Sequence, residues 1–151
     1  MNAYYELLRV LKTSLENNID VNTVTQGDIL EVDLNKKNIF PLAHISVSTG
    51  TFAENVIRFN VQIISMDIRN SVTDTVSDKF VGNDNEIDNL NTSLAVLRRT
   101  YNELVKDKYS EDITIIGEPN LELFTEARQN LLDGWSMNVQ VEVPDTIMSI
   151  C

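Results

Sequence analysis

The fold of this chain is decided by LDGWSMNVQVEVP, residues 132–144. From Trp135 to Val143 every odd position is apolar, and the even positions between them are polar. A strict two-residue period is typical of a β-strand that buries one face and exposes the other. The segment therefore predicts a long strand whose odd-numbered side chains lie in a hydrophobic core.

The same two-residue period recurs at Val56–Asp67, after a turn predicted at 48–51. Its apolar side chains face one way, and its polar side chains, such as Arg58 and Gln62, face the other. This alternation is typical of a half-exposed antiparallel strand. A further turn is predicted at 117–120. Shorter strands are expected at Val21–Gln26, Ile29–Leu34, Ile39–Val47, Ile113–Ile116 and Leu121–Glu126.

Two segments carry helical spacing instead. At Asn2–Asn17 apolar residues recur every three or four positions, which predicts an amphipathic helix. A second helix is expected after a long polar loop at Ile68–Asn85, because Asn83 and Glu86 have the spacing of a capping box. The predicted core-facing stripe of this helix is Ile87, Leu90, Leu94, Leu97, Tyr101 and Leu104.

Together these elements predict an α+β fold. We expect a mainly antiparallel sheet with an N-terminal helix and a second long helix packed on it. A length of 151 residues and a hydrophobic content of 42% suit one domain over 1–151, with a C-terminal tail at 145–151. The predicted core consists of Phe59, Val61, Leu94, Leu97, Trp135, Val139 and Val141.

The charge balance narrows the function classes. Twelve basic and 23 acidic residues give a net charge of −11, which repels phosphate and disfavours ordinary DNA or RNA readout. The single cysteine, Cys151, excludes a disulfide within the chain and a thiolate metal site. No signal peptide and no apolar run long enough for a membrane span is found, so we expect a soluble protein made in the cytoplasm, with no membrane partner.

No catalytic constellation is recognisable in the sequence. The only histidine, His44, has no second histidine or carboxylate cluster on its strand face, and we interpret it as a structural or surface residue. The acidic groups at 28–33 and 84–88 lack the spacing of a calcium loop and suit a solvated face or a helix N-terminus. We therefore expect no enzyme activity, no metal and no cofactor.

Three residues are candidates for partner contacts. Arg98 and Arg99 leave the apolar stripe of the second helix and point outward, where they can face a neighbouring acidic copy. A solvated helix face is the alternative. Trp135 has the parity of the buried strand face, which favours a core role over that of a partner anchor.

Three segments carry a family resemblance: FPLAHI at 40–45, the strand Ile57–Asp67, and DGW at 133–135 with its alternating strand. Pro41 lacks an N–H for a sheet ladder and is expected at a strand start or a sheet edge. With a helix before them and another between the two long strands, these segments resemble the tail terminator and tail-completion proteins of tailed bacteriophages. The likeness spans nearly the whole chain. The chain departs from the family in its long loop at Ile68–Asn85 and in its pronounced acidity.

The resemblance implies a structural virion protein that forms a closed ring, usually of six subunits, at the head-proximal end of the tail tube; a dodecamer is the other stoichiometry considered. Its partners would be the tail tube protein and neck or connector proteins, and DNA would pass through the lumen without specific binding. The alternatives are another neck or connector ring, a tail-tube-like ring and, from another class, a carboxylate-dependent metalloenzyme such as a nuclease. In a ring, the candidate subunit-interface residues are Arg69, Asp74, Asp78, Arg98 and Arg99.

Overall fold

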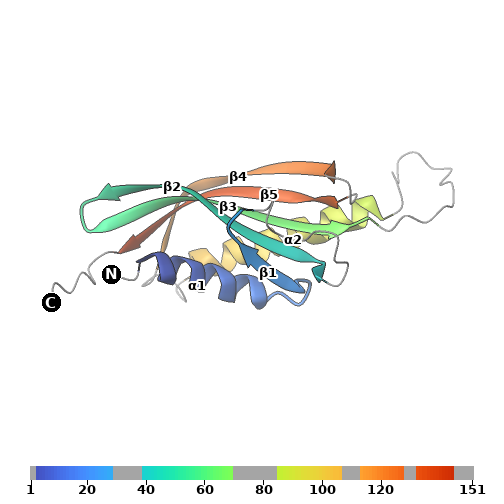
Figure 1. Cartoon of the computed structure of the whole chain (residues 1–151), viewed down its shortest axis with the longest axis horizontal. Helices are drawn as coiled ribbons and strands as arrows, with labels where there is room; N and C mark the ends of the chain where they lie inside the picture. The colour runs from blue at the N-terminus through green and yellow to red at the C-terminus, as the bar shows by residue number, and fades with distance from the viewer. Residues whose placement is uncertain (1–2, 29–38, 70–84, 107–112, 128–131, 145–151) are drawn as a thin grey trace.

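Figure 1 shows a computed structural model of the chain, which describes residues 3–28, 39–69, 85–106, 113–127 and 132–144. The expected α+β class is confirmed, since two helices lie on a five-stranded sheet of order β1-β2-β3-β5-β4. Only the β1–β2 pair is parallel, and the other neighbouring strands are antiparallel. The elements are α1 (Ala3–Glu16), β1 (Thr23–Gln26), β2 (Leu42–Ala53), β3 (Val56–Ile68), α2 (Glu86–Val105), β4 (Thr114–Ala127) and β5 (Leu132–Pro144).

The centre of the sheet is the pair formed by β3 and β5. Every residue of β3 has a partner on β5, from Val56 opposite Pro144 to Ile68 opposite Leu132. The side-chain alternation predicted for both strands is confirmed, because their odd-numbered apolar residues enter the main hydrophobic core. Both helices pack on this same side of the sheet (Figure 1). The other side of the sheet carries the even-numbered residues.

The predicted apolar stripe of α2 is only partly correct. Leu97 and Leu104 are buried, but Ile87 is 45% exposed and Leu94 is half-buried. The helix is rotated about its axis relative to the predicted stripe. The reason is that three polar residues, each with a hydrogen-bond partner, occupy part of its buried face. The buried residues of α2 are Asn89, Ser93, Val96, Leu97, Thr100 and Leu104.

The polar residues on the buried face of α2 tie the helix to its neighbours. Asn89 donates a hydrogen bond from Nδ2 to the carbonyl oxygen of Ile68, 3.2 Å away at the end of β3. Thr100 accepts one from Asn18, which lies two residues after α1 and also donates to the Ser14 carbonyl oxygen. Each of these groups would be costly to bury without a partner. They therefore fix the rotation of α2 that hydrophobic spacing alone did not predict.

The predicted bounds of several strands need correction. The turn expected at 48–51 is absent, because β2 continues to Ala53 and pairs along β3, with a register shift between Val47 and Thr49. The chain reverses instead at Glu54 and Asn55, where Asn55 has a φ of 64°. β-Branched threonines and the ladder to β3 outweigh the turn preference of Gly50.

Likewise, the two strands expected at Ile113–Ile116 and Leu121–Glu126 form the single strand β4. The predicted turn between them is a register shift in its pairing with β5, centred on Gly117 with a φ of 68°. A bulge of this kind bends an edge strand without ending it. The strand expected at Ile29–Leu34 lies outside the described residues.

The segment predicted as a long loop at Ile68–Asn85 is bounded differently at both ends. Ile68 is the last residue of β3, and Asn85 is the N-cap residue of α2. The helix therefore does not begin at the capping box predicted from Asn83. Asn85 itself makes no side-chain capping bond to the helix backbone. Residues 70–84, including Asn83, lie outside the described part of the chain.

Gly134 permits a close backbone approach between β5 and β3. A Cβ atom at this position would overlap the Ser65 carbonyl oxygen and lie 2.9 Å from the Cα atom of Met66. The ring of Phe124 closes the same space at 3.0 Å. Glycine is therefore required here for β3, β4 and β5 to meet above a second, smaller core formed by Phe40, Leu42, Met66 and Leu132.

We expect the substitution Gly134→Ala to lower the free energy of unfolding by about 3 kcal/mol, because the added methyl group forces backbone atoms apart. Gly50→Ala is the matched control, since its Cβ would lie 3.4 Å from the Phe59 ring, an ordinary contact. We expect that control within about 1 kcal/mol of the wild type in urea unfolding. Equal stability of the two variants would show that β3 and β5 do not approach as closely as described.

Candidate functional site

On the side of the sheet away from the helices, one end carries the second core of Phe40, Leu42, Met66 and Leu132, and the end toward the β2–β3 hairpin is a polar surface. Its centre consists of amide side chains in register on β3 and β5, where Asn60 lies opposite Gln140 and Gln62 opposite Asn138. Asn60 and Asn138 are exposed, and the other two are half-buried. Next to them a hollow of about 340 Å³ is bordered by the bulge of β4 at Gly117. We call this polar end of the sheet side the polar face.

The polar face offers almost no free positive charge. Arg58 is its one cation within the described strands, and both its Nε and Nη2 atoms donate to Glu142 Oε1, at 3.1 and 2.5 Å. These two residues are direct neighbours across β3 and β5, so the pair is held by the sheet register. A surface of amides, hydroxyls and one neutralised arginine can lie close to a polyanion without binding it strongly.

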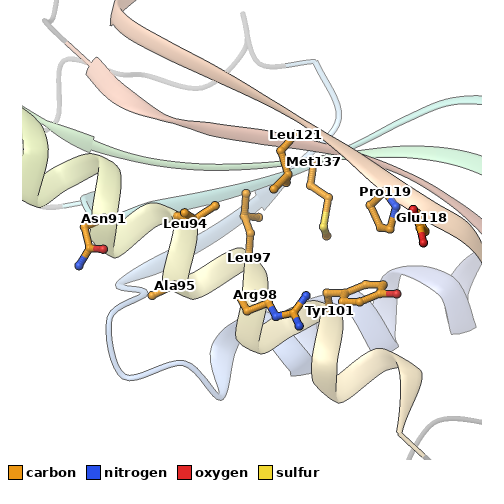
Figure 2. Close-up of a pocket in the computed structure, with 10 residues that line it drawn as sticks. All are labelled: Asn91, Leu94, Ala95, Leu97, Arg98, Tyr101, Glu118, Pro119, Leu121 and Met137. Carbon is orange, nitrogen blue, oxygen red and sulfur yellow. The ribbon is translucent and has the colours of Figure 1, made fainter.

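On the helix side, an apolar groove opens between α2 and β4. α2 covers β3 and β5 more fully than the edge strand β4, and the uncovered space has a volume of about 570 Å³ (Figure 2). Figure 2 shows Leu94 and Leu97 of α2 directed toward Leu121 and Met137 of the sheet. Leu123, on the same face of β4 as Leu121, is 50% exposed. The other lining residues are Asn91, Ala95, Arg98, Tyr101, Glu118 and Pro119.

The five candidate interface residues do not form one cluster. Arg98 lies on the rim of the groove, with its guanidinium carbon 5.8 Å from the centre of the Tyr101 ring, a cation–π contact. Arg99, the next residue, points toward the end of α1 instead and forms an exposed ion pair with Asp20 at 2.6 Å. Asp74 and Asp78 lie outside the described residues.

Arg69 is placed inside the subunit rather than on its surface. Its side chain is 3% exposed, and it donates from Nε and Nη2 to the fully buried carboxylate of Asp133, at 3.0 and 2.7 Å. Glu86, the first residue of α2, lies 3.4 Å from the same guanidinium. Arg69 therefore joins β3, β5 and α2 within one chain, and this corrects its assignment as a contact to an adjacent copy.

The sequence held one signal for this buried pair. Asp133 occupies an odd position of β5, where the alternation calls for an apolar side chain. A polar residue at a core-facing position predicts a buried partner, because an uncompensated charge there is very costly. Arg69 directly follows β3 and was predicted as an interface residue, because its pairing with Asp133 depends on the register of β3 and β5.

Asp67 lies directly opposite Asp133 across the same two strands. Burial raises the pKa of the Asp67 carboxyl above its ordinary value of 3.8, and the nearby negative charge of Asp133 acts in the same direction. A hydrogen bond from the Ile68 backbone N–H, 2.8 Å away, opposes the rise in the pKa. The charged form of Asp67 is therefore a net cost to the folded state near neutral pH.

His44 is a structural residue. It is fully buried on β2, where Nε2 lies 2.8 Å from the Gly27 carbonyl oxygen and Nδ1 lies 2.7 Å from the Thr25 hydroxyl. The Gly27 carbonyl can only accept, so Nε2 carries a proton, and in the neutral ring Nδ1 then accepts from the Thr25 hydroxyl. Trp135 also faces the core as predicted, and its Nε1–H donates to the Leu90 carbonyl oxygen at 3.0 Å.

Neither a metal site nor a membrane span is found in the described part of the chain. No group of three or more metal-ligating side chains comes together within those residues. No helix there is long and apolar enough to cross a membrane. No protein-family model matches the sequence, and no curated protein matches it significantly. The two surfaces described above are therefore the features from which a function must be argued.

We expect Asp67→Asn to raise the free energy of unfolding at pH 7, because the amide removes a buried negative charge and keeps the acceptor for the Ile68 N–H. Below the pKa of an unfolded aspartate the wild-type carboxyl is neutral in both states, so the gain should disappear at pH 3. As the pH rises through the raised pKa of the folded state, the unfolded state releases the proton more readily and the wild type loses stability. Urea unfolding of both proteins at pH 3, 5 and 7 measures this, and an equal gain at all three values would contradict it.

Proposed function

We propose that this chain is a structural subunit of a ring in the tail or neck of a bacteriophage virion, where it terminates the tail tube and joins it to the neck around the DNA conduit. The observation that carries the proposal is the difference between the two sides of the sheet. One side holds both helices and the main core. The other side carries the second core at one end and the polar face at the hairpin end. A protein that encloses passing DNA needs a broad polar surface without free positive charge.

The chemistry of the polar face suits a DNA conduit. Its amides at Asn60, Asn138 and Gln140 carry no net charge, and its arginine is already paired with Glu142. Phosphate contacts made by free arginines and lysines would hold the DNA and slow its passage. The net charge of −11 adds a general repulsion, so the DNA would stay in the centre of the lumen.

The resemblance to tail terminator and tail-completion proteins supports the same role. Its carrying segments are the structural centre of the fold, since DGW includes both the buried Asp133 and the close-packed Gly134. A ring of six copies is the stoichiometry that this family suggests, and a dodecamer is the second. Another neck ring or a tube-like ring would use the same surface, so the position in the tail must be tested directly.

The test is polymerisation of the tail tube subunit of the same phage, with and without this protein, followed by electron microscopy of tube lengths. A terminator binds one end of each tube, and we expect shorter tubes of uniform length with density at a single end. Gly50→Ala protein serves as a folded control that should act like the wild type. Tubes of unchanged length would contradict termination, and incorporation along the whole tube would indicate a tube-like subunit instead.

A further inference from the structure

We propose that the apolar groove between α2 and β4 binds the tip of the β2–β3 hairpin of a second copy of this chain. In this contact Phe52 enters the groove, and Glu54 pairs with Arg98 on its rim. The inference rests on the proposed ring in one respect, because the second copy would be the neighbouring subunit. It goes further in naming the two surfaces that meet.

The groove is suited to one large apolar side chain. It is lined on the helix wall by Leu94 and Leu97 and on the sheet wall by Leu121 and Met137 (Figure 2). Its volume of about 570 Å³ is ample for an aromatic ring and the backbone that carries it. Leu121 is 44% exposed in the single chain, so water is displaced from apolar surface when the groove is filled.

The hairpin tip presents such a side chain on a rigid support. Phe52 is 82% exposed, although it sits in a regular ladder opposite Ile57 of β3. The turn that follows contains only Glu54 and Asn55, so the strand is held up to its last residue. An aromatic ring on a fixed strand loses little conformational freedom on binding, which favours its use as an anchor.

Charge identifies the hairpin tip as the partner. In the described part of the chain, Arg98 has no carboxylate within ion-pair distance. Within the same residues, the carboxylate of Glu54 has no cation within that distance. Each group therefore lacks an opposite charge that the other can supply. Glu118, on the opposite wall of the groove, disfavours a second carboxylate there and directs Glu54 toward the α2 side.

Two other apolar side chains are more than three-quarters exposed, but their neighbouring carboxylates are already paired. Tyr5 is 77% exposed, and the adjacent Glu6 accepts from Arg9 at 2.7 Å. Ile19 is 94% exposed, and the adjacent Asp20 is paired with Arg99. Of these three exposed apolar residues, Phe52 is therefore the one beside a carboxylate that remains available to Arg98.

The arrangement of the two surfaces makes the contact head-to-tail. Figure 1 shows the tip of the β2–β3 hairpin at one end of the molecule, whereas α2 and β4 flank the groove farther along its length. A copy that uses its hairpin on one neighbour keeps its groove open for the next. Such heterologous contacts close into a ring when the rotation between copies permits it.

The contact is tested by a charge exchange followed by native mass spectrometry and sedimentation velocity of the full chain. We expect Arg98→Glu and Glu54→Arg each to weaken self-association by about tenfold or more, because each places like charges together. The double variant restores the opposite pair, so its association should return to within about threefold of the wild type. Arg99→Glu is the matched control, with the same charge change one residue away, and should weaken association by less than about twofold.

Phe52→Ala supplies the apolar arm of the test and should weaken association at least as much as either single charge reversal. Thermal unfolding of each variant separates lost contact from lost folding. If the wild type forms a ring that the single variants and Phe52→Ala leave intact, this contact is wrong and the ring remains. If the wild type stays monomeric at all concentrations, both the contact and the ring are wrong. If the variants lose tube termination while self-association persists, the groove binds a different protein and the contact is overturned.

Discussion

The continuous pairing of β3 with β5 is the constraint on which the rest of the structure depends. Its register brings Gly134 against the backbone of Ser65 and Met66, and it sets Arg69 beside the buried carboxylate of Asp133. A slip by one residue would turn every core side chain of one strand toward the opposite side of the sheet. It would also separate a buried ion pair whose members are strongly unfavourable when left alone. The two strands therefore have one acceptable alignment, and both helices pack on the surface that this alignment creates.

The same alignment gives the molecule its two functional surfaces. The even-numbered residues of β3 and β5 place amides in rows on the polar face, and the paired Arg58 and Glu142 leave it without a free cation within the described strands. On the helix side, the buried polar contacts of Asn89 and Thr100 rotate α2 so that Leu94 borders open space next to β4. The groove thus follows from how α2 is anchored, and the hairpin follows from the extension of β2 beyond the short strand β1.

Sequence period predicted the strands and the helices well, because each depends on which side chains share a face along one element. Turns were less predictable: Gly50 and Gly117 both suggested chain reversals, yet each lies within a strand whose ladder to its neighbour continues past it. The Arg69–Asp133 pair and the groove could not be derived in this way, since both depend on register and on the distance between separate elements. Of the predicted interface residues, Arg69 proved to be an internal anchor and Arg98 lies at the groove, although their sequence settings are similarly polar.

The most direct measurement of the central claim is a cryo-electron microscopy reconstruction of the purified, concentrated protein. We predict a closed ring in which the polar face, with Asn60 and Asn138, borders the lumen and the helices lie on the outside. We also predict contact between copies at the groove of α2 and β4. A ring with its helices toward the lumen, an open filament, or particles no larger than one chain would contradict this claim.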